Sequence, residues 1–175
     1  RSLELVSVST RSSCGHTLRN VMCSEDAGAG LDEAFDCMPD ASAVSAAVVA
    51  RSAELNCKLP GRINMVFGGS ARCREDAMIN DAGFLSVLRD GEPGYEVWAG
   101  GSLGKAPRLA IRLSPFVPRD EVLAAAEALI EVYVACGPLD HPARGRMKFV
   151  VEELGEDQFR RAWHRAFEAP AAPQM

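Results

Sequence analysis

The chain has 175 residues, 47% of them hydrophobic and 25% charged, which suffices for one domain with a hydrophobic core. The formal net charge of -5 argues against a nucleic-acid partner, because binding to phosphates requires a concentrated basic face. No apolar run reaches the length of a membrane span, and the first residues lack the pattern of a signal peptide, so we expect a soluble, cytoplasmic protein.

The first part of the chain carries weak structural signals. Residues 1–10 alternate in places between apolar and polar side chains, which fits a short strand or the end of a helix. They enter without a helix cap or a leader, so we expect the chain to be an excerpt of a longer polypeptide. Residues 12–30 are rich in Gly, Ser and Asp and predict mostly loop, with a short helix over 17–22 as the alternative.

The first clear helix is followed by a strand. An alanine-rich segment after Pro39 and Asp40 predicts a helix over 42–55, with Asp or Ser as its cap. Gly61 then interrupts the chain. Residues 63–67 alternate in the manner of a strand, which two glycines end.

Two further strands are predicted at 84–88 and 95–99. The turn signal Asp90-Gly91 lies between them and indicates a hairpin. Together with the preceding strand, they predict an antiparallel sheet with hairpin connections. A glycine-rich loop over 100–104 follows the last of these strands.

The strongest helix signal covers 122–135. Asp120 and Glu121 place negative charge in its first turn, and Gly137-Pro138 ends it. The apolar spacing between these signals is helical.

The C-terminal part predicts further helix. Residues 147–153 are amphipathic, Gly155 interrupts them, and 157–167 continue as helix. We therefore expect an α+β fold, an antiparallel or mixed sheet with helices packed on one face, formed by a single domain over 1–168. The Pro- and Ala-rich tail, 169–175, is predicted to be disordered.

The cysteines and histidines show no metal-binding spacing. The six cysteines are Cys14, Cys23, Cys37, Cys57, Cys73 and Cys136. No two of them are two residues apart, so the spacings of zinc and ferredoxin sites are absent. Disulfide frameworks belong to small secreted domains, and we expect reduced, mostly buried thiols. The histidines, His16, His141 and His164, are spread along the chain.

The glycines after the third predicted strand and the acids between the first and the second allow two interpretations each. The amides of Gly100, Gly101 and Gly104 would be able to cradle an anion, although a turn at the end of a strand is the more common use of such glycines. Asp76, Asn80 and Asp81 lie in a segment that fits a capped turn better than an acidic binding cluster.

Basic side chains suggest an anion site. Arg62 and Asn64 are two residues apart on a predicted strand, so they share a face and would suit a small oxyanion or a carboxylate-rich cofactor. The alternative is a solvated strand face. Arg144, Arg146 and Lys148 alternate just before a helix and form either a surface patch or contacts to cofactor carboxylates.

Five segments in this order resemble those of the nitrite/sulfite reductase family. They are CGHTLRNV (14–21), LPGRIN (59–64), NDAGF (80–84), WAGGSLG (98–104) and RGRMKF (144–149). The similar family segments read CGDxxRNV, LPRKFN, NDIGF, VGGGLG and KARLKF. The resemblance covers nearly the whole chain, and its specificity comes from the order of the five motifs.

The resemblance implies a large reductase. Members of the family use sirohaem beside a 4Fe-4S cluster to reduce nitrite to ammonia, or sulfite to sulfide, with six electrons from a donor such as ferredoxin or NAD(P)H. They consist of two related halves, and the cluster cysteines lie in the second. This chain resembles the sirohaem-type domain of the first half, so alone it is expected to hold no cofactor or metal and to be inactive.

The resemblance also implies the site. It assigns Arg19, Arg62 and Asn64 to the catalytic anion site. The implied sirohaem contacts are Arg19, Asn20, Arg62, Asn64, Arg144, Arg146 and Lys148. The amide of Asn64 favours nitrite as the substrate, because sulfite enzymes often carry Lys at that position.

The chain departs from the family pattern at several positions. Arg62 replaces the usual Lys, and a planar fork is not equivalent to a point charge. His16 replaces Asp, and Glu25 and Asp26 add acids close in sequence to the anion site. These departures keep two alternatives open: a non-catalytic binding or structural module of the same fold, and a precorrin-3B synthase-like oxidoreductase.

Overall fold

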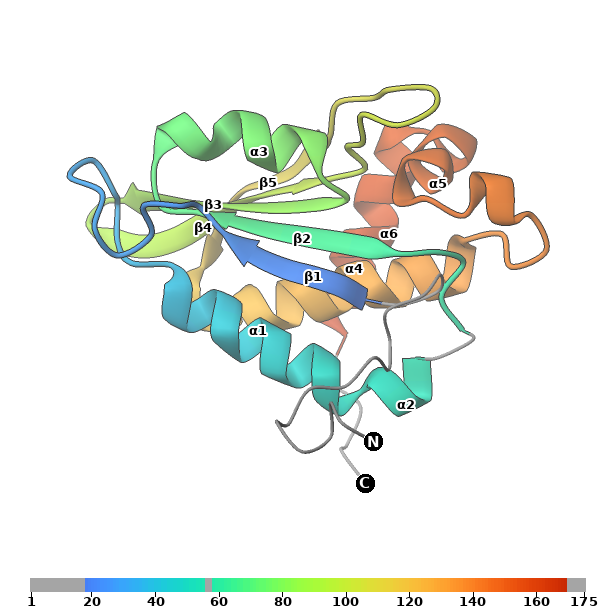
Figure 1. Cartoon of the computed structure of the whole chain (residues 1–175), viewed down its shortest axis with the longest axis horizontal. Coiled ribbons are helices and arrows are strands. Elements are labelled where there is room, and N and C mark those ends of the chain that lie inside the picture. Colours follow the sequence, from blue (N-terminus) through green and yellow to red (C-terminus); the bar gives the residue numbers. More distant parts are fainter. Residues whose placement is uncertain (1–17, 56–57, 170–175) are drawn as a thin grey trace, which may run out of the picture.

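The computed structural model describes residues 18–55 and 58–169, which build a five-stranded mixed sheet (Figure 1). Its strands are β1 (Leu18–Cys23), β2 (Ile63–Gly68), β3 (Ala82–Arg89), β4 (Glu92–Ala99) and β5 (Ile111–Pro118). They lie in the order β1-β2-β3-β4-β5. The pairs β1-β2 and β2-β3 are parallel, and β3-β4 and β4-β5 are antiparallel.

Helices cover both faces of the sheet. The long helices α1 (Met38–Ala50), α4 (Val122–Cys136) and α6 (Glu156–Glu168) pack against one face, and short α3 (Arg74–Ile79) covers part of the other (Figure 1). Helix α5 (Met147–Leu154) lies at one end of the sheet, and α2 (Ser52–Leu55) extends α1. Single 3-10 turns are η2 (Ala71–Cys73), η3 (Arg119–Glu121) and η4 (Pro142–Arg144).

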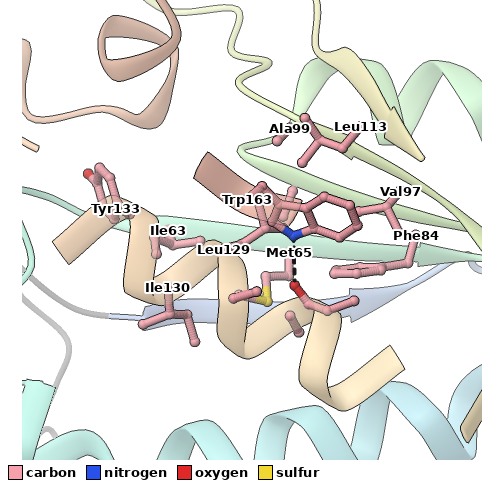
Figure 2. Close-up of a cluster of buried hydrophobic side chains, with 14 of the residues drawn as sticks. Ile63, Met65, Phe84, Val97, Ala99, Leu113, Leu129, Ile130, Tyr133 and Trp163 are labelled. Atoms are coloured by element: carbon pink, nitrogen blue, oxygen red, sulfur yellow. Dashed lines mark hydrogen bonds between the residues drawn. The ribbon is translucent and has the colours of Figure 1, made fainter. Parts of the chain in front are cut away.

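The main core fills the space between the sheet and α1, α4 and α6. Alternate residues of β2, Ile63, Met65 and Phe67, are completely buried in it. The indole of Trp163 lies between α4 and the sheet (Figure 2), and its Nε1 donates a 3.2 Å hydrogen bond to the carbonyl of Ala125. The period-two pattern of β2 therefore matches a strand that faces a helical layer.

The α+β class, the mixed sheet and the packing of the long helices on one face confirm the sequence prediction, although the short α3 also covers part of the other face. The strand at 63–67 and the hairpin between 84–88 and 95–99 are also present. The antiparallel arrangement predicted for all three strands is wrong, because β2 and β3 are parallel and α3 makes the crossover between them. Because α3 has only six residues, its sequence pattern is too short to distinguish a helix from the capped turn that the sequence predicts there.

Two strands were not predicted. Residues 18–23 form β1 and not the expected loop or short helix, because pairing with β2 stabilises a segment that has no alternation of its own. β5 contains Pro115 and ends at Pro118, which weaken a strand signal but are tolerated at the edge of a sheet. The predictions for residues 1–10, Cys14, His16, Cys57 and 170–175 concern positions outside the described residues.

No helix among the described residues is both long and apolar enough to cross a membrane. The described cysteines are free thiols: Cys37 and Cys73 are buried, Cys23 is partly buried and Cys136 is exposed.

We expect the thiol of Cys37 to resist alkylation in the folded protein. Burial, followed by the charge of neighbouring Cys23, raises the pKa of Cys37 to about 12. Because the thiolate is the nucleophile, only on the order of one molecule in ten thousand is reactive at this position at pH 8. Peptide mass spectrometry after iodoacetamide treatment should find Cys136 modified and Cys37 intact, until urea unfolds the chain. Equal labelling of both cysteines in the folded protein would contradict the burial of Cys37.

Candidate functional site

A pocket of about 390 Å³ lies at the end of the sheet where β2 begins, a volume within the range of small-molecule sites. Three segments line it: the residues before β2, the glycine-rich loop after β4, and the residues that lead into α5. Figure 1 shows the β4-β5 loop and α5 together at this end of the sheet. The polar and aromatic lining includes Arg62, Ser102, Lys105, Arg146, Lys148 and Phe149.

Close backbone contacts hold these segments together. A Cβ atom on Gly61 would lie 1.9 Å from the carbonyl oxygen of Gly145, so only glycine allows this approach. The same carbonyl accepts a hydrogen bond from the buried hydroxyl of Tyr133 on α4. A Cβ on Gly101 would lie 2.2 Å from the carbonyl oxygen of Met78, at the end of α3. The glycines therefore let the pocket walls contact each other directly.

Arg146 forms the strongest polar contact of the pocket. Its Nη2 donates to both oxygens of Asp81, at 3.0 and 2.8 Å, and its Nε donates to Oδ1 at 3.1 Å. Asp81 is completely buried, and its Oδ2 also accepts the amide hydrogen of Asn64 at 3.0 Å. Burial raises the pKa of Asp81, while the charge of Arg146 and the Asn64 amide act in the opposite direction.

Lys148 holds the glycine-rich loop. Its side chain is buried, and Nζ donates to the carbonyls of Lys105 at 2.5 Å and Ala106 at 2.8 Å. Burial, followed by the charge of Arg146, lowers the pKa of Lys148. The ammonium group therefore contributes positive charge to the pocket wall while it fixes the loop that carries Lys105.

The glycine-rich loop uses its first amides internally. The amide of Gly100 donates to the carbonyl of Asp81, and that of Gly101 to the carbonyl of Asn80, both at 2.9 Å. The amide of Ser102 donates to the carbonyl of Arg108 at 2.8 Å. Gly100 and Gly101 are thus part of a turn that leaves β4, and the interpretation of their amides as an anion cradle is wrong.

Arg144 lies apart from the other predicted cofactor contacts. Its guanidinium stacks over the ring of Phe149 at 4.7 Å and pairs with Glu152 at 3.6 Å and Glu153 at 3.4 Å. It does not belong to the pocket lining found among the described residues. These contacts fit the surface alternative better than a cofactor contact.

The remaining predicted site residues lie on β1 and β2 beside the pocket. Asn20 is the register partner of Asn64, and Arg19 sits at an irregularity of the β1-β2 ladder. Both β1 side chains are exposed. Asn64 is half-buried, and its Oδ1 has no hydrogen-bond partner in the described part of the chain. The fold therefore gathers Arg62, Arg146 and Lys148 in one pocket and places Arg19, Asn20 and Asn64 on the adjoining strands.

Glu25 and Asp26 do not adjoin this site. Both are exposed in the loop that follows β1, at the opposite end of that strand from Arg19. Figure 1 shows this loop at the left and α5 at the right. Proximity in sequence misled the prediction, because six residues of extended strand separate the two ends by roughly 20 Å.

The sequence alone missed Asp81, Ser102 and Lys105 as members of this region. Asp81 directly precedes a buried strand, and a carboxylate in such a position requires a partner. The need for such a partner is the sequence signal that could have identified Asp81, but no spacing along the chain identifies Arg146 as that partner.

The donor set of the pocket fits a carboxylate-rich cofactor or an oxyanion. Arg62, Lys105 and Arg146 are among its lining residues, and guanidinium and ammonium groups form charge-assisted hydrogen bonds with carboxylates. By contrast, the described residues contain no group of three or more Cys, His, Asp or Glu that could hold a metal ion. They therefore do not fit an iron–sulfur cluster, for which thiolate ligands are required.

Comparisons with known proteins all point to nitrite and sulfite reductases. The family model described as "Nitrite and sulphite reductase 4Fe-4S domain" matches residues 14–170. Sulfite reductase [ferredoxin] 1 of Mycolicibacterium paratuberculosis is 32% identical over 161 residues, covering 91% of this chain and 28% of the relative. Ferredoxin–nitrite reductase of Synechococcus elongatus is 32% identical over 169 residues, covering 90% and 32%. The chain thus spans 28–32% of the length of these relatives.

Solved structures agree with the fold. The Mycobacterium tuberculosis NirA protein superposes with a TM-score of 0.80 and 28% identity, over 94% of this chain and 30% of that one. Dissimilatory sulfite reductase I superposes with a TM-score of 0.70 over 91% of this chain and 54% of that one, at 12% identity, and supports the fold alone.

Proposed function

This chain belongs to the nitrite and sulphite reductase 4Fe-4S domain family, and on that premise we propose that it is part of a ferredoxin- or NAD(P)H-linked assimilatory reductase. The complete protein would reduce nitrite to ammonia or sulfite to sulfide with six electrons. The observation that carries the proposal is the pocket lined by Arg62, Lys105, Arg146 and Lys148, since both the substrates and a carboxylate-rich cofactor are anionic.

In this proposal the pocket holds an edge of sirohaem. Arg62, Lys105 and Arg146 bind peripheral carboxylates, and Lys148 keeps the loop that carries Lys105 in place. When bound, sirohaem supplies the iron centre at which the anion accepts electrons. A cytoplasmic location remains a prediction that accompanies this function.

Arg19, Arg62 and Asn64 are proposed to bind and orient the substrate anion. Arg19 and Arg62 supply positive charge from neighbouring positions of β1 and the start of β2, where the ladder pairs Asn20 with Asn64. The Oδ1 of Asn64 is buried and has no hydrogen-bond partner among the described residues, so a water that reaches it would be able to donate to it. An uncharged amide here favours nitrite over sulfite by resemblance to the family.

The second half of the reductase is proposed to supply the cluster. The described residues offer no ligand set for it, so the electrons must reach the anion through a part of the enzyme other than these residues. The isolated chain is accordingly expected to contain no iron and to show no turnover. The alternative of a non-catalytic module loses one of its supports, because Glu25 and Asp26 lie far from the pocket.

We expect Arg62→Ala in the complete protein to lower kcat/KM for the anion by about 100-fold or more, the effect of removing one charged donor from a reacting centre. Reduction of nitrite and of sulfite by reduced viologen measures it. Arg72→Ala is the matched control, because Arg72 is a highly exposed arginine paired with Asp32. Full activity of Arg62→Ala on both anions would remove Arg62 from the site.

A further inference from the structure

We infer that Asp81 is the positioning residue of the pocket: it fixes Arg146 in the orientation that binds an anionic ligand. The inference rests on the proposed function for the identity of the ligand. It deepens that function by naming a residue that acts through another and touches no ligand itself.

Asp81 is the point where the three walls of the pocket meet. Its Oδ1 accepts from Arg146 in the wall that leads into α5, and its Oδ2 accepts from the amide of Asn64 at the start of β2. Its main-chain carbonyl accepts from Gly100 in the glycine-rich loop. One fully buried residue therefore connects all three segments.

The ion pair with Asp81 also leaves only one edge of the Arg146 guanidinium available to a ligand. Nε and Nη2 are committed to the carboxylate of Asp81, whereas Nη1 has no hydrogen-bond partner among the described residues. Arg146 lines the pocket, and its side chain is 21% exposed. A two-point contact holds a planar guanidinium in one orientation, so Asp81 directs Nη1 towards a ligand.

The carboxylate further balances the positive charge of the pocket. Arg62, Lys105, Arg146 and Lys148 all contribute to the lining, and Asp81 is fully buried between the segments that carry them. Without it, Arg146 would lose its fixed partner and be free to turn towards the solvent. The pocket would keep its cations but lose the defined geometry of one of them.

The test uses the complete protein that contains this chain and a double-mutant cycle. The single variants Asp81→Asn and Arg146→Gln and the double variant are titrated with sirohaem, followed by absorbance, and with citrate, followed by calorimetry. If Asp81 acts through Arg146, each single variant weakens binding about tenfold or more, and the double variant is no weaker than either. Asp76→Asn, which changes an exposed acid of the same segment, should stay within twofold of the wild type.

The outcomes separate this inference from the proposed function. Additive losses in the cycle, or an Asp81→Asn variant that binds as the wild type does, overturn the positioning role and leave the function intact. A wild type that binds citrate but not sirohaem overturns the function, while non-additivity with citrate still supports Asp81. Binding of neither probe by the wild type overturns both. Where Asp81→Asn does not fold, Arg146→Lys, which keeps a cation opposite Asp81 but removes the fork, must weaken binding for the inference to stand.

Discussion

Replacing Trp163 by alanine is expected to lower the free energy of unfolding by about 3–5 kcal/mol, the range for removal of a large buried aromatic side chain. Trp163 is completely buried between α4 and the sheet, beside Leu129, Val97 and Leu113 (Figure 2). Only Phe159 and Trp163 are buried on α6, so the attachment of that helix depends heavily on this indole.

Guanidinium chloride unfolding followed by circular dichroism measures the effect, because the variant retains Trp98 as its only tryptophan and fluorescence would report on a different site. Leu88→Ala is the control: Leu88 is 57% exposed at the end of β3, and surface changes usually stay within about 0.5 kcal/mol. A loss below about 1 kcal/mol in Trp163→Ala would show that α6 does not pack on the core as described.

The second large effect is expected for Gly101→Ala. The new methyl group would lie 2.2 Å from the carbonyl oxygen of Met78 and 2.7 Å from that of Asn80. Both atoms belong to the main chain, so no side-chain rotation relieves the overlap, and the loop must move. We expect a loss of about 1–3 kcal/mol in stability, as for other overpacked sites, and weaker binding of anions, since the loop carries Lys105.

Thermal unfolding and citrate titration of the same samples separate the two effects. For stability, Gly104→Ala is the matched control in the same loop: apart from its chain neighbours, the one described atom within 4 Å of its new methyl group is the hydroxyl oxygen of Ser102, at 3.9 Å. If Gly101→Ala and Gly104→Ala unfolded at the same temperature, the close contact between the glycine-rich loop and the end of α3 would be wrong.

The parts of the fold that could be predicted are those with local signals. Asp120 and Glu121, in the 3-10 turn just before α4, and Gly137, just after it, delimit this helix, and the hairpin between β3 and β4 follows from Asp90-Gly91. The direction of β2 relative to β3 could not be predicted, because it depends on a crossover through a helix of six residues. β1 likewise owes its structure to partners 44 or 45 positions further along the sequence, and no local pattern marks it.

For the site as well, some features could be predicted from the sequence and others could not. Resemblance to a family pointed to Arg62, Arg146 and Lys148, which the fold gathers in one pocket. It did not indicate that Lys148 binds loop carbonyls or that Arg144 pairs with Glu152 and Glu153. These differences arise from tertiary contacts. A buried ammonium group such as that of Lys148 requires hydrogen-bond acceptors, and the surface guanidinium of Arg144 pairs with the nearest acids.

We propose that the pocket at the start of β2 belongs to a sirohaem enzyme. The most direct test is the sirohaem content of the complete protein, purified from cells that synthesise the cofactor and measured by its absorption bands and by extraction. We expect stoichiometric sirohaem in the wild type and a marked loss in an Arg62→Ala, Arg146→Gln double variant that remains folded. A folded wild-type protein without sirohaem under these conditions would contradict it.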